Sequence, residues 1–178
     1  MRHVISVLVD NEPGVLSRIS GLFSGRGFNI ESLNVAETLD PSISRMTLVT
    51  SGNEQIIEQI IKQLNKLVNV IKVTDFQDAE VVSREMVLVK ISADEKTREE
   101  VLRMVEIFRG RIVDVSLKSY IVEITGNEEK VKAFLNLVRP LGIKELVRTG
   151  SVAMMRGEKV MRARDKESKG GTDGEGLL

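Results

Sequence analysis

The feature that most constrains the fold is the order of elements that the hydrophobic pattern predicts between residues 3 and 76. Short apolar runs rich in β-branched residues predict strands, and apolar residues spaced three or four apart predict amphipathic helices. The strands are expected at 3–9, 27–37, 44–51 and 68–76, and the helices around Val15, Leu16, Ile19, Leu22 and Phe23, and around Ile56, Ile57, Ile60, Ile61, Leu64 and Leu67. In this βαββαβ order, both right-handed crossovers place their helices on one face of the sheet. Because most strand positions are apolar, we expect the opposite face to be covered too, which favours an oligomer.

The same order recurs in the second half of the chain. Strands are expected at 84–92, 111–117, 119–125 and 144–155, and helices around Val101, Leu102, Val105 and Phe108, and around Val131, Phe134, Leu135 and Val138. Residues 22–33 (LFSGRGFNIESL) also resemble residues 107–117 (IFRGRIVDVSL). A period of about 85 residues is too long for a solenoid repeat, so we predict two tandem domains.

The predicted fold class is therefore α+β, with two tandem ferredoxin-like βαββαβ domains whose antiparallel sheets carry helices on one face. The predicted domains are 1–77 and 78–158. Residues 159–178 are charged and rich in glycine, with few apolar anchors, so we predict a disordered tail there.

Composition argues against several classes of function. The 26 basic and 26 acidic residues balance, and only 3% of the residues are aromatic, so neither a nucleic-acid binder nor an anionic-membrane binder is expected. There is no cysteine, which excludes disulfides, thiolate zinc sites and cysteine nucleophiles. No apolar run approaches the roughly 20 residues of a membrane span, and no signal-peptide pattern is present, so we expect a cytoplasmic protein. The single histidine, His3, is expected to be partly exposed at the start of a strand.

No catalytic constellation is present among the sequence motifs. The patterns G-x-x-x-x-G-K-[ST], G-x-S-x-G and H-E-x-x-H are all missing, and one histidine leaves little for a transition metal. The stretch GLFSGRG (21–27) has the glycines of a phosphate loop, but it follows a helix and is expected to end that helix. Asp94 or Thr97 is expected to cap the third helix.

The turn DNEPG (10–14) differs from an ordinary helix start. A strand-to-helix turn presents free N–H groups, and the helix dipole favours an anion there. Pro13 is tolerated in a first helical turn, and Gly14 lets a ligand approach the backbone closely. Asn11 adds a neutral donor and acceptor.

A second asparagine, Asn29, follows the glycine-rich turn and adds another neutral donor and acceptor. This combination suits a zwitterion, with its carboxylate on helix N–H groups and its ammonium on amide and backbone oxygens. Val15, Leu16 and Ile30 are expected to form an apolar wall for a short aliphatic side chain. The residues alone leave an alternative open, in which Asn11 is a simple N-cap and Gly14 a packing residue.

Three stretches closely resemble the N-terminal ACT domain of acetohydroxyacid synthase (acetolactate synthase) small subunits: DNEPGVLSRISGLFSGRGFNIESLNVAET, SRMTLVT and KQLNKLVNVIKV. REMVLVKI, EIFRGRIVDVS and GSVAMMRGEK are similar to the C-terminal domain of the same family. The resemblance runs in order through both domains, from residue 1 to about residue 160.

The resemblance implies a regulatory subunit without a catalytic site or cofactor of its own. Its partner would be the large catalytic subunit, which carries thiamine diphosphate, magnesium and FAD. The small subunit would activate that partner and confer feedback inhibition by branched-chain amino acids, chiefly valine. In the family, two ACT domains pair side by side and the effector lies at their interface. The resemblance implies Asn11 and Gly14 from one subunit, and Asn29 and Ile30 from the other.

The second repeat departs from this pocket pattern. In place of Asn11-Glu12-Pro13-Gly14 it has Ala93-Asp94-Glu95-Lys96-Thr97, with no glycine and two carboxylates. An amino-acid carboxylate would meet like charge there, so we expect no effector site in the second domain. By resemblance, that domain is expected to make dimer and large-subunit contacts.

Two other functions remain open at this point. One is a free-standing tandem ACT sensor that acts on another protein, although the balanced charge and the lack of a helix-turn-helix segment count against direct DNA binding. The other is a small acylphosphatase-like enzyme on the same fold, for which Arg26 and Asn29 are the only nearby candidates.

Overall fold

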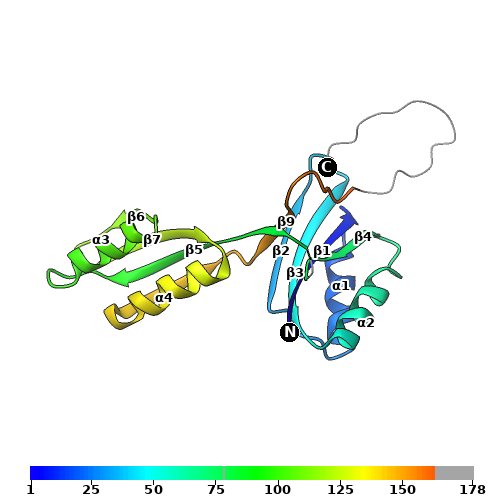
Figure 1. Cartoon of the computed structure of the whole chain (residues 1–178), viewed down its shortest axis with the longest axis horizontal. Coiled ribbons are helices and arrows are strands. Elements are labelled where there is room, and N and C mark those ends of the chain that lie inside the picture. The colour runs from blue at the N-terminus through cyan, green and yellow to red at the C-terminus, as the bar shows by residue number, and fades with distance from the viewer. Residues whose placement is uncertain (78, 163–178) are drawn as a thin grey trace. The chain divides into compact units, whose positions relative to one another are not determined.

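The computed structural model describes residues 1–77 and 79–162, which form two compact units. The first unit contains Met1–Val82 and the described residues from Ala153 onward, and the second contains Ser83–Val152. Figure 1 shows one sheet with two helices on one face in each unit. The predicted fold class, two tandem ferredoxin-like domains with antiparallel sheets, is confirmed. The predicted domain limits at residues 77 and 158 stay predictions.

The first unit has the expected order of elements. They are β1 (Arg2–Asp10), α1 (Val15–Ser24), β2 (Ser32–Glu37), β3 (Ile43–Ser51), α2 (Glu54–Leu64) and β4 (Val70–Asp75). The strands pair in the order β2-β3-β1-β4, so β2 and β4 are the edges. Ile5, Val7 and Val9 of β1 point toward the helices and pack on Ile19 and Ile60. Strand β2 starts five residues later than predicted.

The second unit repeats this arrangement. Its elements are β5 (Val81–Ser92), which enters it from the first unit, α3 (Arg98–Ile107), β6 (Arg111–Val115), β7 (Ser119–Gly126), α4 (Glu128–Gly142) and β8 (Ile143–Arg148). The last strand, β9 (Val152–Met155), belongs to the first unit from Ala153 onward. The sheet order is β6-β7-β5-β8, and β9 also pairs with β5. The prediction of one strand over 144–155 was wrong. Gly150, with a φ of 81°, interrupts it and divides it into β8 and β9.

The second face of the first sheet is covered in part by the chain's own C-terminal segment. Leu8 pairs with Arg45 across the two central strands, and their side chains lie opposite the helices. The Arg45 guanidinium donates to the Ser6 hydroxyl and to the Ala153 carbonyl of β9, both at 3.0 Å. Loss of hydration lowers the Arg45 pKa. Because Ser6 and Leu8 are already buried in this single chain, the apolar pattern of the strands does not by itself require an oligomer.

His3 departs from the expectation of partial exposure, which was wrong. Its side chain is only 2% exposed, and its Nδ1 lies 2.9 Å from a carboxylate oxygen of Asp75. This contact joins the start of β1 to the end of β4, which compensates part of the cost of burying the polar ring.

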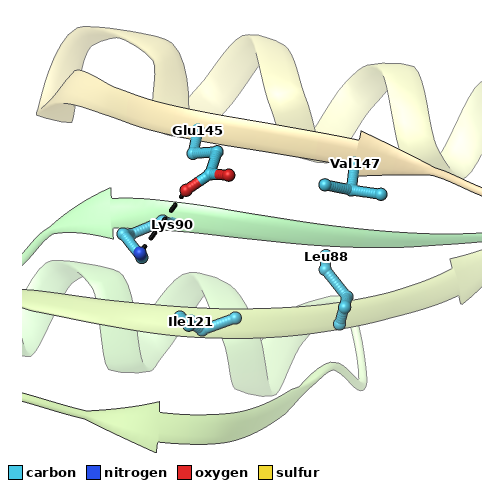
Figure 2. Close-up of a pocket in the computed structure, with 5 residues that line it drawn as sticks. All are labelled: Leu88, Lys90, Ile121, Glu145 and Val147. Carbon is cyan, nitrogen blue, oxygen red and sulfur yellow. Dashed lines mark hydrogen bonds and ion pairs between the residues drawn. The ribbon is translucent and has the colours of Figure 1, made fainter.

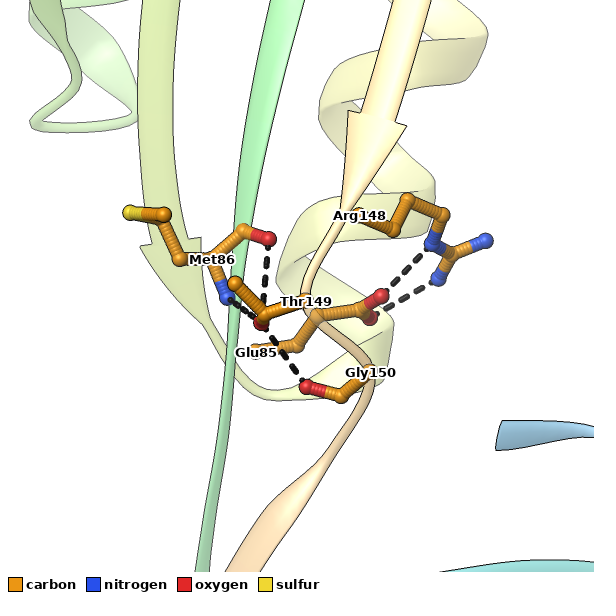
Figure 3. Close-up of polar contacts among 5 residues, drawn as sticks. All are labelled: Glu85, Met86, Arg148, Thr149 and Gly150. Atoms are coloured by element: carbon orange, nitrogen blue, oxygen red, sulfur yellow. Dashed lines mark hydrogen bonds and ion pairs between the residues drawn. The ribbon is translucent and has the colours of Figure 1, made fainter. Parts of the chain in front are cut away.

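An ion pair between a half-exposed arginine and a buried glutamate anchors the end of β8 to β5. Arg148 Nε and Nη2 donate to the two carboxylate oxygens of Glu85 at 2.6 and 2.8 Å, as Figure 3 shows. The Glu85 side chain is 5% exposed, so this two-pronged contact provides hydrogen bonds to a carboxylate that is shielded from water. Thr149 Oγ1 adds a contact to Met86, because it accepts from the Met86 N–H at 3.1 Å.

Substituting Arg148 by methionine is expected to lower the free energy of unfolding of the second unit by about 2 kcal/mol, because it leaves a buried carboxylate without a cation. The only tyrosine, Tyr120, is buried in that unit, so urea unfolding followed by tyrosine fluorescence reports on it selectively. Lys90→Met is the matched control, since Lys90 pairs with exposed Glu145 at 3.4 Å and should cost less than about 0.5 kcal/mol. Equal losses in the two variants would contradict this prediction.

Candidate functional site

The turn between β1 and α1 leaves the helix start open. Gly14 is the N-cap residue with a φ of 86°, and no side chain caps the helix. Neither the Leu16 N–H nor the Ser17 N–H has a hydrogen-bond partner among the described residues. A Cβ built on Gly14 would meet no atom within 4 Å. Free N–H groups and open space therefore coincide at the positive end of the helix dipole, which favours an anion.

Asn11 connects this turn to the one between β2 and β3. Its backbone N–H donates to the Ser42 carbonyl at 2.7 Å, and its side-chain amide donates to the Pro41 carbonyl at 2.8 Å. Asp40 holds that second turn by accepting from the Ser42 hydroxyl at 2.7 Å and from the Ser42 N–H at 2.9 Å. The Ser42 hydroxyl, and then the Ser42 N–H, lower the pKa of the Asp40 carboxyl.

The alternative role for this turn is wrong. Asn11 does not cap α1, because its amide donates to Pro41 and Gly14 occupies the N-cap position. Gly14 is not a packing residue either, since its missing side chain faces open space. The sequence had suggested that Pro13 lies in the first helical turn, but it lies two residues before the first helical residue. The left-handed backbone of Gly14 explains this later start, because the chain turns there before the helix begins.

The three apolar residues expected to form a wall lie in different surroundings. Val15 is buried in the core, Leu16 is 41% exposed beside the open helix start, and Ile30 is half-buried. Of the three, therefore, only Leu16 and Ile30 present apolar area to a ligand at the surface.

Asn29 and Ile30 lead into the start of β2. The Asn29 carbonyl accepts from Thr50 Oγ1 at 2.7 Å, and the Asn29 side chain makes no hydrogen bond within the described part of the chain. The carboxylate of the next residue, Glu31, accepts from Ser51 Oγ and, at 3.1 Å, from Arg2 Nε. These contacts hold the start of β2 against β1 and β3. The hydrogen bond from Ser51 and then the Arg2 guanidinium hold the pKa of the Glu31 carboxyl below its ordinary value of 4.5.

The two halves of the predicted site lie at opposite ends of the same sheet. Arg2 pairs with Ser51 at one end of β1 and β3, near Asn29, and Asp10 pairs with Ile43 at the other end, near Asn11. At about 3.4 Å per residue, these ends are roughly 25 Å apart. One chain therefore brings Asn11, Gly14 and Leu16 together, and separately Asn29 and Ile30, but it does not join the two groups.

Asn69 is a neighbour of the site that the sequence pattern did not indicate. Its side chain donates to a Glu12 carboxylate oxygen at 3.1 Å and accepts from the Arg18 guanidinium. Its backbone carbonyl accepts from the Asp10 N–H at 2.9 Å. The sequence did not indicate these contacts because the partners of Asn69 lie 51 to 59 positions earlier in the chain. The apolar residues around Asn69 predicted only a strand.

The corresponding turn of the second unit is closed by its own side chain. Asp94 Oδ1 accepts from the Lys96 and Thr97 N–H groups at 3.0 Å and from the Thr97 hydroxyl at 2.9 Å. These bonds, led by the one from the Thr97 hydroxyl, lower the pKa of the Asp94 carboxyl. Thr97 is the N-cap residue of α3, without a side-chain cap. An anion approaching the start of α3 would therefore meet the like charge of the Asp94 carboxylate.

A shallow pocket occupies the other face of the second sheet. Figure 2 shows its lining residues on the face opposite the helices: Leu88, Lys90, Ile121, Glu145 and Val147. Lys90 Nζ and Glu145 Oε2 pair across it at 3.4 Å, so the two charges compensate each other. The pocket is otherwise apolar and offers no separate pair of polar groups for the two ends of a zwitterion.

The described residues contain neither a metal-binding cluster nor a membrane-spanning helix. No group of three or more histidine, cysteine, aspartate or glutamate side chains in residues 1–77 and 79–162 is arranged to hold a metal ion. Within the same residues, none of the helices is both long and apolar enough to cross a membrane. The predicted disorder of the tail falls largely on residues 163–178, which lie outside the described part, whereas Met161 is buried.

Comparison with known proteins finds similarity to one protein family in both units. The family model described as "AHAS small subunit-like ACT domain" matches residues 5–72, and that described as "Small subunit of acetolactate synthase" matches residues 84–157. A relative from Archaeoglobus fulgidus, named "Probable acetolactate synthase small subunit", is 54% identical over 159 residues, covering 89% of this chain and 99% of the relative. The "Acetolactate synthase isozyme 3 small subunit" of Escherichia coli is 51% identical over 163 residues, covering 91% of this chain and all of that protein.

A solved structure agrees with these relatives. The crystal structure of an acetolactate synthase small subunit from Thermotoga maritima matches with a TM-score of 0.81 and 44% identity. The match covers 89% of this chain and 99% of that one, so the similarity extends over nearly the whole of the solved chain.

Proposed function

The chain belongs to the family of acetolactate synthase small subunits, and we propose that it activates a large catalytic subunit and confers feedback inhibition by valine. The valine would bind between the ACT domains of two copies. Thiamine diphosphate, magnesium and FAD are expected on the large subunit.

The observation that carries this proposal is the separation of the two half-sites. Asn29 lies just before β2, and the turn that Asn11 contacts lies just after it. Because β2 is an edge strand, a second copy can pair with it in the antiparallel direction. A twofold axis at that edge brings the Asn29 end of one copy beside the Gly14 end of the other. Two equal sites result, each built from both chains.

The groups that would meet there suit an aliphatic amino acid. The free N–H groups at the start of α1 favour its carboxylate. The Asn29 side-chain oxygen, which has no partner among the described residues, would accept from its ammonium. Leu16 and Ile30 would contact a short apolar side chain. This arrangement compensates both charges of the ligand without placing a net charge in the site.

Feedback requires that valine bind more tightly to the inhibited arrangement of the complex than to the active one. Coupling between an effector site and a distant active site is typically about 1–3 kcal/mol. The second unit, where the Asp94 carboxylate lies in the turn before α3, would contribute dimer and large-subunit contacts in place of a second effector site.

Calorimetric titration of the isolated chain with valine, leucine and isoleucine tests the proposal, with Asn29→Ala measured alongside. We expect saturable binding of valine, and an affinity about tenfold lower in the variant because one hydrogen bond to a charged group is lost. The same titration is then repeated on the complex with the large subunit. If neither the chain nor the complex binds a branched-chain amino acid, feedback at this site is excluded.

A further inference from the structure

We propose that Asn69 is a positioning residue that holds the Glu12 carboxylate away from the N-terminus of α1. The N–H groups there then stay open to the carboxylate of a bound amino acid. This inference rests on the proposed function, because it concerns the same site.

Three contacts of Asn69 carry the inference. The residue is 8% exposed, and its side chain lies between two charged groups. Its Nδ2 donates to Glu12 Oε2 at 3.1 Å, and its Oδ1 accepts from Arg18 Nη1. Its backbone carbonyl also accepts from the Asp10 N–H. These partners fix the orientation of the amide, because one side must donate to a carboxylate and the other must accept from a guanidinium.

The Glu12 carboxylate has two competing places to bind. Glu12 precedes the N-cap glycine by two residues, and the free N–H groups and dipole of α1 attract a negative side chain. No side chain caps the helix in the structure, and the carboxylate accepts from Asn69. The Asn69 amide therefore competes with the Leu16 and Ser17 N–H groups for one carboxylate. If the helix won this competition, a ligand carboxylate would meet both an occupied site and a like charge.

The variant Asn69→Asp tests whether Asn69 acts through its hydrogen bond to Glu12 or only by filling space. The two side chains have nearly the same shape, and aspartate keeps an oxygen for Arg18, but the group that faces Glu12 changes from a donor to an acceptor. Repulsion should release Glu12 toward the helix and raise the Kd for valine about tenfold. The second change Glu12→Gln removes the charge and supplies an N–H donor to the introduced aspartate. The double variant should recover to within about threefold of the unchanged chain.

A second readout needs no ligand. In Asn69→Asp, hydrogen exchange at the Leu16 and Ser17 N–H groups should slow, because the released carboxylate now accepts from them. In the double variant, their exchange should return to the original rate. Asn65→Asp is the matched control: Asn65 is exposed and its side chain donates to the Ile61 carbonyl. It should change neither readout.

The outcomes distinguish this inference from the proposed function. Unchanged exchange and unchanged valine affinity in Asn69→Asp would overturn the role of Asn69, while the effector site would stand. A double variant as weak as Asn69→Asp would also overturn it, because a structural defect is not repaired by removing a charge from Glu12. If the unchanged chain and its complex bind no branched-chain amino acid, the proposed function fails, and the exchange rates still decide whether Asn69 restrains Glu12.

Discussion

Replacing Gly14 by aspartate is expected to abolish valine inhibition of the reconstituted enzyme while activation of the large subunit persists. A side chain at Gly14 meets no atom within 4 Å, so the subunit should still fold. The positive φ of 86° adds about 1 kcal/mol of backbone strain, which a domain of this size tolerates. The new carboxylate occupies the free N–H groups and repels the ligand carboxylate. Together these effects should weaken valine binding by about 3 kcal/mol, or more than a hundredfold.

Two controls separate charge from strain in this experiment. Gly14→Ala carries a similar strained backbone without the charge, and it should retain most of the valine response. Gly157→Asp places the same charge on another left-handed glycine with open space around its Cβ, and it should behave like the unchanged chain. Inhibition is measured as the activity of the complex over a range of valine concentrations. Full valine sensitivity in Gly14→Asp would place the effector elsewhere.

Mixing two variants that are each impaired in a different half of the site is expected to restore part of the high-affinity valine binding, if each site is shared between two chains. Gly14→Asp removes one half-site and Asn29→Ala weakens the other. In a mixed dimer, one site carries both changes and the other carries neither. With random pairing, half of the dimers are mixed and each has one intact site, so about a quarter of all sites should regain full affinity.

The two variants are unfolded together and refolded in equal amounts, and high-affinity sites are counted by calorimetry. The control mixes Gly14→Asp with Gly14→Asp/Asn29→Ala, which cannot form an intact site in any pairing. A site contained within one chain would give no recovery in either mixture. Recovery in the first mixture alone would therefore establish both the shared site and the symmetry of the dimer.

Much of the fold could be predicted because the hydrophobic pattern is local. The alternation in β3 and the stripe of α2 each identify an element from neighbouring residues, and the order βαββαβ then limits the sheet. The glycine-rich turn after α1 also ended the helix as expected, with the Phe28 N–H donating to the Phe23 carbonyl. The open helix start was suggested by Gly14, although its left-handed conformation could not be read from the residue alone.

The features that the sequence did not predict depend on contacts between residues that lie far apart in the chain. The pattern around Asn69 is that of a strand start, and its contacts with Glu12 and Arg18 exist only because β4 pairs with β1. The burial of His3 likewise depends on Asp75, which lies 72 residues later in the chain. The separation of Asn11 from Asn29 follows from the direction of β2, which sequence spacing does not reveal.

Strand β9 has a consequence for the order in which the protein is made. Ala153 belongs to the first unit although the whole second unit precedes it in the chain, and its carbonyl binds the Arg45 guanidinium. During synthesis, the ribosome therefore releases every residue of the second unit before it releases the segment that covers Ser6 and Leu8. The second unit is encoded continuously and can fold as soon as it emerges, whereas the unit that emerges first is completed last.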